Sequence, residues 1–155
     1  MIVGFLRHAE AEAMAVSDKE RRLTPKGLEQ AEKVGKFCAR IGWVPDCILS
    51  SPASRERETT EAVAARLGGI DIVIENFLSC GMSPREFLAE IPAFARFQTV
   101  LLVGHQPDFG EVIAELLELP PGALRIRKAS LTVIDLPDLR AGTGRLEFFL
   151  PVRLM

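Results

Sequence analysis

The sequence predicts a three-layer α/β/α sandwich built on a mainly parallel sheet, and three observations support this fold class. Short apolar runs alternate with segments of helical periodicity, which is the pattern of repeated βαβ units. Glycine and proline residues mark most of the boundaries between these segments. The last two apolar runs, residues 131–136 and 146–150, are separated by a glycine-containing turn, so we expect them to form an antiparallel hairpin at one edge of the sheet.

The parallel strands are predicted from apolar runs without polar alternation, because the strands of a parallel sheet are covered on both faces. Four such runs occupy residues 2–6, 47–49, 70–74 and 99–103. The run at 99–103 is the most apolar, and we expect it to lie in the centre of the sheet.

The predicted helices begin and end at residues with clear conformational preferences. Thr24 is a good N-cap and Pro25 suits the first helical position, so a helix is predicted from Pro25 until Gly42 ends it. Further helices are predicted from Ser50-Ser51-Pro52 to Leu67, from Ser83-Pro84 to Pro92, and across residues 109–117.

Length and composition limit the class of protein. The 155 residues are expected to form one domain over residues 1–155. With 48% hydrophobic residues and a net charge of −2, the chain has no broad basic surface for nucleic acid. No apolar run approaches the length of a membrane span. Cys38, Cys47 and Cys80 show no CxxC spacing, so we expect reduced thiols and a cytoplasmic location.

Both histidines of the chain directly follow predicted buried strands. His8 follows the first strand and is preceded by Arg7, and His105 follows the most apolar strand. Another strand leads into a polar segment that carries Arg55 at the start of a helix. The carboxyl ends of parallel strands meet at one edge of a sheet, where open α/β sheets bind their ligands. We therefore expect these four side chains to line one pocket.

This set of side chains is suited to binding a phosphoryl group. Guanidinium groups donate in a planar fork that matches phosphate oxygens, and helix N-termini at the same edge add N–H donors. Glu10 and Glu12 could join the histidines as metal ligands, but the neighbouring arginines would repel a cation. The sequence therefore predicts an anion site that uses no metal and no cofactor.

Three motifs taken together resemble the histidine phosphatase superfamily. They are Arg7-His8-Ala9-Glu10, Ser51-Pro52-Ala53-Ser54-Arg55 with Glu58-Thr59-Thr60, and Gly104-His105-Gln106-Pro107. A fourth segment, Arg21-Arg22-Leu23-Thr24-Pro25-Lys26-Gly27, resembles the small phosphohistidine phosphatases of the SixA type. The resemblance covers nearly the whole chain and implies a phosphoglycerate mutase-like fold. The short length of the chain favours the SixA-type branch.

The resemblance implies a role for each matching residue. His8 corresponds to the nucleophile that becomes phosphohistidine, Arg7 and Arg55 to the pocket arginines, and His105 to the second pocket histidine. Arg21 either reaches the pocket from its loop or is only solvated. The implied activity is that of a metal-independent phosphatase. Its substrate would be a phosphorylated protein side chain, phosphohistidine before others, or a small phosphate compound.

Two positions depart from the family pattern. Ala9 stands where glycine is most common, which would matter only if residue 9 needs a positive φ. Related enzymes carry an acidic residue after the third strand, where this chain has Glu75 followed by Asn76. If Glu75 is not the general acid, substrates with good leaving groups are favoured. A chain without turnover would instead be a phosphate-binding module for phosphorylated partners.

Overall fold

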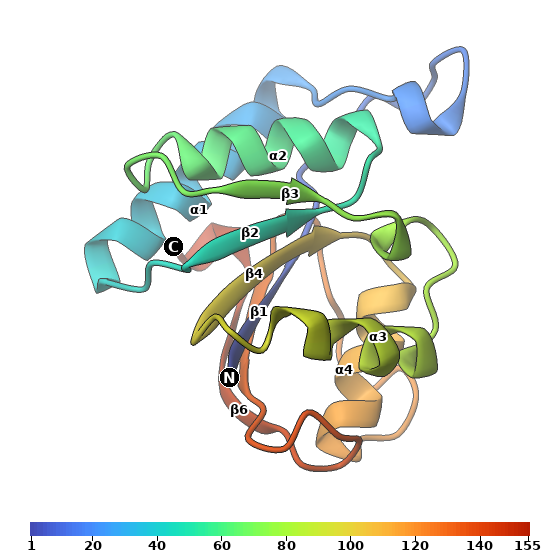
Figure 1. The fold of residues 1–155 in the computed structure, drawn as a ribbon. Coiled ribbons are helices and arrows are strands. Elements are labelled where there is room, and N and C mark those ends of the chain that lie inside the picture. The colour runs from blue at the N-terminus through green and yellow to red at the C-terminus, as the bar shows by residue number, and fades with distance from the viewer.

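The computed structural model describes residues 1–155 and contains one six-stranded sheet (Figure 1). The strand order is β3-β2-β4-β1-β5-β6. Strands β3, β2, β4 and β1 are parallel, whereas β5 runs antiparallel to β1 and β6 antiparallel to β5. The bounds are β1 Ile2–Arg7, β2 Cys47–Ser50, β3 Ile72–Ile74, β4 Thr99–Gly104, β5 Leu131–Asp135 and β6 Arg145–Leu150. The predicted central position of β4 and the edge hairpin are thus confirmed.

Helices cover both faces of this sheet, as predicted for a three-layer sandwich (Figure 1). Helices α1 (Pro25–Ile41) and α2 (Ser54–Ala64) lie on one face, and α3 (Pro84–Glu90) and α4 (Asp108–Leu117) on the other. Four short 3-10 helices complete the chain: η1 Asp18–Glu20, η2 Asn76–Leu78, η3 Ile91–Phe94 and η4 Val152–Leu154. No helix combines the length and the apolar character that crossing a membrane requires.

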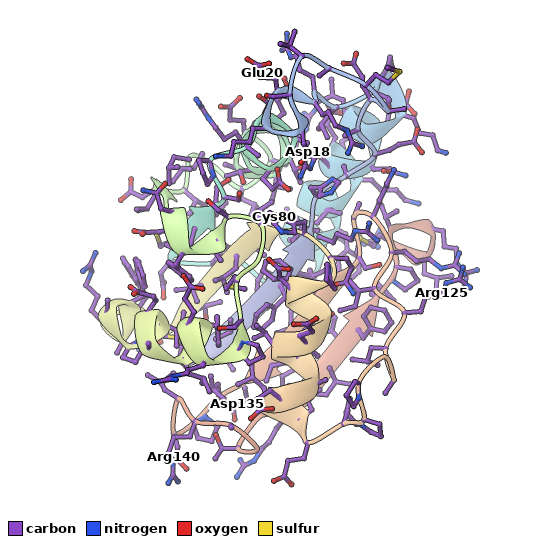
Figure 2. All side chains as sticks on the ribbon, turned by 90° about the vertical axis from the view of Figure 1, so that its right-hand side faces the viewer. Asp18, Glu20, Cys80, Arg125, Asp135 and Arg140 are labelled. Carbon is purple, nitrogen blue, oxygen red and sulfur yellow. The ribbon has the colours of Figure 1, made fainter.

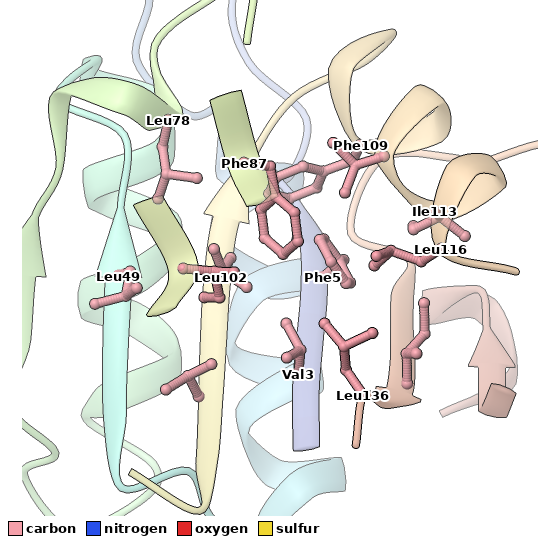
Figure 3. Close-up of a cluster of buried hydrophobic side chains, with 14 of the residues drawn as sticks. Val3, Phe5, Leu49, Leu78, Phe87, Leu102, Phe109, Ile113, Leu116 and Leu136 are labelled. Atoms are coloured by element: carbon pink, nitrogen blue, oxygen red, sulfur yellow. The ribbon is translucent and has the colours of Figure 1, made fainter. Parts of the chain in front are cut away.

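Each face of the sheet carries its own buried hydrophobic cluster. On the α3 and α4 side, the ring of Phe5 packs edge-on against Phe109 with centroids 5.3 Å apart, and lies 5.5 Å from Phe87 (Figure 3). The next residue, Leu6, is buried in the cluster on the α1 and α2 side. Strand β1 therefore buries both of its faces, which explains why its sequence is apolar throughout.

The helix boundaries follow from local bonds. Helix α1 has the predicted start and end, because Thr24 Oγ1 accepts a bond from Gly27 N at 3.0 Å and Gly42 adopts a left-handed φ of 70°. Helix α2 is shorter than the predicted 50–67. It cannot begin at Ser51, whose N–H still donates to Val103 O of the sheet at 3.0 Å. Its last turn tightens instead of continuing, since Leu67 N donates to Ala64 O, three residues back.

Candidate functional site

The register of the central strands brings the two histidines to the same edge of the sheet. Arg7 at the end of β1 is paired with Gly104 at the end of β4, and Ser50 at the end of β2 is paired with Val103. The ladder extends one residue further, because His8 N donates to Gly104 O at 2.8 Å. His8 and His105 thus follow directly from adjacent parallel strands, as the sequence predicted.

His8 is held as a neutral imidazole. Its side chain is 5% exposed, and its Nδ1 lies 2.7 Å from the carbonyl oxygen of Ala9. With the proton on Nδ1 donated to that carbonyl, the lone pair of Nε2 is free for attack on an electrophile. Burial lowers the pKa of His8 to about 4, and the positive charges of Arg55 and Arg7 act in the same direction, whereas the Glu56 carboxylate opposes them. The ring is therefore uncharged at neutral pH.

Arg7 is fixed by the segment that precedes β5. Its Nη1 donates to the carbonyl oxygen of Ile126 at 2.9 Å, while its buried Nε has no hydrogen-bond partner within the chain. The same guanidinium charge contributes to the low pKa of His8. Arg7 is therefore a positioned cation with donor capacity left for an anion.

Arg55 is buried in the first turn of α2 and is bound by two acids. Its Nη1 donates to the backbone carbonyl of Asp18 at 2.7 Å, and its Nη2 lies 3.1 Å from Asp18 Oδ2. On the other side its Nε lies 3.1 Å from Oε1 of the fully buried Glu56. A guanidinium held at both ends in this way keeps one orientation, which anion clamping requires.

His105 lies between two carboxylates. Its Nδ1 is 3.5 Å from Glu56 Oε1, and its Nε2 is 2.9 Å from Asp108 Oδ2. Interaction with Glu56 raises the pKa of His105 above its ordinary value, and the charge of Asp108 adds to this, whereas burial and Arg55 oppose it. The two histidines are thus tuned in opposite directions, with His8 neutral and His105 favoured as a cation.

Asp108 also ties His105 to the loop that follows η2. Its Oδ2 accepts hydrogen bonds from Gly81 N at 2.8 Å and from Met82 N at 2.9 Å. The loop and the imidazole are therefore positioned by the same carboxylate oxygen. The two hydrogen bonds from Gly81 and Met82 hold this loop where Ser79 and Cys80 lie beside His105.

Of the four side chains expected to share one pocket, Arg55 and His105 line a small cavity together with Asp18, Lys19, Ser79 and Cys80, whereas Arg7 lines a separate cleft. Figure 2 shows Asp18 and Cys80 near one another at this end of the sheet. The cavity encloses about 30 Å³, which is room for about two water molecules. The cavity is thus smaller than a phosphoryl group, and the Asp18 carboxylate lies on Arg55 at its edge. A larger cavity of about 720 Å³ between α1 and α2 contains neither histidine.

Glu75 does not line this cavity, although it directly follows β3 as expected. Its backbone N–H continues the sheet by donating to Ser50 O at 2.9 Å, and the chain then passes through η2 before Ser79 and Cys80 reach the site. Burial raises the pKa of the Cys80 thiol, and the nearby acids raise it further, so this cysteine is a thiol rather than a thiolate nucleophile.

Arg21 supports the Asp18 loop from outside the cavity. Its Nε donates to Glu12 O at 2.6 Å and its Nη1 donates to Asp18 Oδ1 at 3.0 Å. The sequence left two alternatives for Arg21, a position in the pocket or a solvated side chain, and the structure shows neither. Arg21 holds the aspartate that in turn contacts Arg55.

Residues 23–27, the Leu-Thr-x-x-Gly segment, lie against Glu10, in the loop that follows β1. Thr24 N donates to Glu10 O at 3.0 Å, and a side chain at Gly27 would collide with that same carbonyl group. Ala9 is fully buried, donates its N–H to Thr59 Oγ1 at 3.1 Å, and is not among the residues with positive φ. Alanine therefore fits at position 9 without backbone strain.

Three residues of the site escaped the sequence analysis: Asp18, Glu56 and Asp108. Glu56 follows Arg55 in a charged stretch that reads as a solvated helix start, and only the tertiary packing of α2 buries it. Asp18 lies in a loop without periodicity. Asp108 carried a usable signal, because it stands three residues after His105 at the start of a predicted helix.

Comparisons with known proteins agree on one family. The model of the histidine phosphatase superfamily (branch 1) matches residues 3–79. The phosphohistidine phosphatase SixA homolog of Haemophilus influenzae is 33% identical over 129 residues, covering 75% of this chain and 77% of that protein. The SixA structure from Agrobacterium tumefaciens has a TM-score of 0.84 at 33% identity, over 97% of both chains. A structure of the protein histidine phosphatase SixA complexed with tungstate has a TM-score of 0.90 at 22% identity, over 99% of both chains. This chain therefore belongs to the histidine phosphatase superfamily.

Proposed function

We propose that the chain is a phosphatase that works through a covalent phosphohistidine at His8. The observation that carries this proposal is the geometry of His8, whose low pKa agrees with it. His8 is a buried, neutral imidazole with its Nδ1 at a carbonyl oxygen and its Nε2 free, next to two positioned arginines. A neutral nitrogen among fixed cations is what in-line attack on an anionic phosphoryl group needs.

The proposed reaction has two displacement steps. In the first, Nε2 of His8 forms a bond to phosphorus while the bond from phosphorus to the leaving group breaks. In the second, the oxygen of water bonds to phosphorus while the bond from Nε2 to phosphorus breaks, its electron pair returns to Nε2, the water gives up a proton to solvent, and inorganic phosphate is released. Arg7 and Arg55 hold the phosphoryl oxygens, and the charge of the nearby His105 imidazolium helps to offset theirs, which is the main demand of phosphoryl transfer.

The leaving group is the basis for the proposed substrate. Glu75 does not line the cavity, and Asp18, which does, has its pKa lowered by its bond with Arg21 and by the charge of Arg55. An ionised carboxylate cannot donate a proton to a leaving oxygen. We therefore favour a substrate whose leaving group needs little help, such as phosphohistidine in a protein. The names of the relatives, phosphohistidine phosphatase and protein histidine phosphatase, support the same substrate.

The test is a trapping experiment on wild-type protein and the His8→Ala variant. Phosphate should be released from an activated aryl phosphate by the wild type and not by the variant. Quenching during turnover must be alkaline because phosphoramidates are labile in acid, and mass spectrometry should then place one phosphate on His8. Labelling that persists in His8→Ala but vanishes in His105→Ala would reverse the assignment of the nucleophile. Binding of phosphate without any release would make the chain a phosphate-binding module.

The substrate is tested with a panel of phosphohistidine proteins and small phosphomonoesters. We expect phosphohistidine proteins to give the highest kcat/KM. A small phosphomonoester that exceeds them would replace the proposed substrate while leaving the covalent mechanism in place.

A further inference from the structure

A second cleft begins at Arg7 and is strongly basic. It has a volume of about 470 Å³, and five of its lining residues are the cations Arg7, Arg125, Arg127, Lys128 and Arg153. The only acid in its lining is Glu10. The whole protein has a net charge of −2, so this concentration of positive charge is local.

The cations of this cleft are available to a ligand. The side chains of Arg125, Arg127, Lys128 and Arg153 form no ion pair and no hydrogen bond within the chain, whereas Arg55 and His105 of the small cavity each lie against two carboxylates. Glu10 is held mainly from outside this set, because its Oε2 lies 3.1 Å from Lys26 Nζ and its Oε1 accepts from Thr24, and of the four it interacts electrostatically with Lys128. The cleft therefore presents an excess of positive charge, with Arg125, Arg127 and Arg153 free of any ion pair, and it shares Arg7 with the proposed phosphoryl site.

The segment that carries three of these cations is fixed relative to the nucleophile. Ala129 N donates to the carbonyl oxygens of Arg7 at 3.0 Å and of His8 at 3.2 Å. Arg127 and Ser130 close a turn, since Arg127 N donates to Ser130 Oγ at 3.0 Å and Ser130 N donates to Arg127 O, also at 3.0 Å. Residues 125–128 are thus anchored to the backbone of the catalytic strand.

Building on the proposed phosphatase function, we infer that this cleft binds acidic side chains flanking the phosphorylated residue of a protein substrate. Arginine clusters recognise acidic and phosphorylated segments in proteins. A site for a small organic ligand is mostly apolar and encloses its ligand. Here only two of the ten lining residues are hydrophobic, and Arg125, Arg127 and Arg153 are exposed. Exposed, long and charged side chains suit the surface of a protein partner.

The test measures binding by the full-length His8→Ala variant, so that it does not depend on turnover. Two fluorescent peptides carry the same phosphonate mimic of phosphohistidine, one flanked by glutamates and the other by glutamines. We expect the acidic peptide to bind about 10-fold more tightly at low salt, because several exposed charge pairs each contribute a few-fold. Added salt should reduce this preference.

Substitutions then test whether the cleft residues cause the preference for the acidic peptide. Adding Arg125→Gln and Arg127→Gln together should reduce it to about two-fold or less. The matched control is Arg140→Gln, which removes an exposed arginine paired with Asp138 and should leave the preference unchanged; Figure 2 shows Arg140 at the lower left, away from Arg125 at the right. Equal affinity for the two peptides, or a preference that the double substitution does not reduce, would overturn the inference.

Two other outcomes would separate the ligand of the cleft from the proposed phosphatase function. If pyrophosphate binding depended on Arg125 and Arg127 while the two peptides bound equally, the cleft would be a site for small polyanions and the assignment to a protein segment would be wrong. Failure of the wild type to release phosphate from an aryl phosphate would overturn the proposed function, and the peptide preference would be judged separately.

Discussion

Oε1 of the buried Glu56 lies 3.5 Å from Nδ1 of His105. The same oxygen lies 3.1 Å from Nε of Arg55, so one carboxylate without solvent exposure contacts both Arg55 and His105. Glu56 touches no part of the expected phosphoryl group. It is therefore a positioning residue, which orients His105 and Arg55 and sets the charge of the imidazole.

Glu56→Gln should move both limbs of the pH profile of kcat/KM to lower pH. Glu56 raises the pKa of His105 and of His8, so its neutralisation lowers both values. His105 then loses its proton at a lower pH, and His8 remains neutral to a lower pH. We expect kcat/KM near neutral pH to fall by at least about 10-fold, because the clamp loses its orientation.

The controls for this prediction are two substitutions on the same helix. Glu56→Asp keeps the negative charge, so both limbs of its pH profile should lie closer to those of the wild type than the limbs of Glu56→Gln do. Glu61→Gln neutralises an exposed acid of α2 and should leave the profile unchanged. A uniform loss of activity without any shift in either limb would assign Glu56 a purely structural role.

The two histidines should titrate far apart. Because the chain contains only two, each imidazole signal can be assigned by NMR with the aid of His8→Ala. We expect one midpoint at about 4 for His8 and one above 6.5 for His105. The unfolded chain takes up a proton on His8 near pH 6.5 and the folded chain only near 4, so this residue destabilises the fold progressively as pH falls through that range. Two coincident midpoints near 6.5 would contradict the proposed tuning.

Asp18→Asn should strengthen the binding of inorganic phosphate by about 2–5-fold, in line with the removal of one exposed charge. The Asp18 carboxylate lies 3.1 Å from Nη2 of Arg55 and competes with an incoming anion. Arg55 keeps its orientation in this variant, because the bond from its Nη1 to the Asp18 carbonyl oxygen and the contact with Glu56 both remain.

The measurement for Asp18→Asn is the inhibition constant of phosphate against an aryl substrate. The matched control is Asp138→Asn, which neutralises an exposed acid paired only with Arg140. Weaker phosphate binding in Asp18→Asn would show that the carboxylate orients Arg55 rather than competing for it.

Glu75→Gln should have the same small effect, less than about two-fold, on aryl and alkyl phosphates. General acid help is typically worth about 10²–10⁴-fold and matters most for poor leaving groups. Glu75 does not line the cavity, so we expect no such dependence. The check is the dependence of kcat/KM on leaving-group pKa for wild type and variant. A loss that grows with leaving-group pKa would restore Glu75 as the acid.

Much of the fold could be predicted from the sequence because its signals are local. Thr24, Pro25 and Gly42 define the ends of α1, and the apolar runs give the strands. The central position of β4 followed from its apolar composition, since a strand between two others is covered on every side. The bounds of α2 were less accurate because its start depends on Ser51 remaining bonded to β4, which is a tertiary interaction.

The site could be predicted only in part for the same reason. Arg7, His8, Arg55 and His105 each stand at a strand end or helix start, which is visible in the sequence. Glu56 acquires its place by burial beneath α2, and burial of a charged residue has no local signal.

The order of the strands in the sheet means that the first half of the chain cannot form the proposed site without the second half. Residues 3–79, the part that matches the family model, include β1, β2 and β3. Strand β4, however, lies between β1 and β2 in the sheet, so these strands do not meet without it. A fragment that ends before Thr99 lacks the spacer that sets the distance between His8 and Arg55, and any pairing of β1 with β2 would give a different site. During synthesis His8, Arg7 and Arg55 are made first, yet they can come together as in this structure only after β4 has been added.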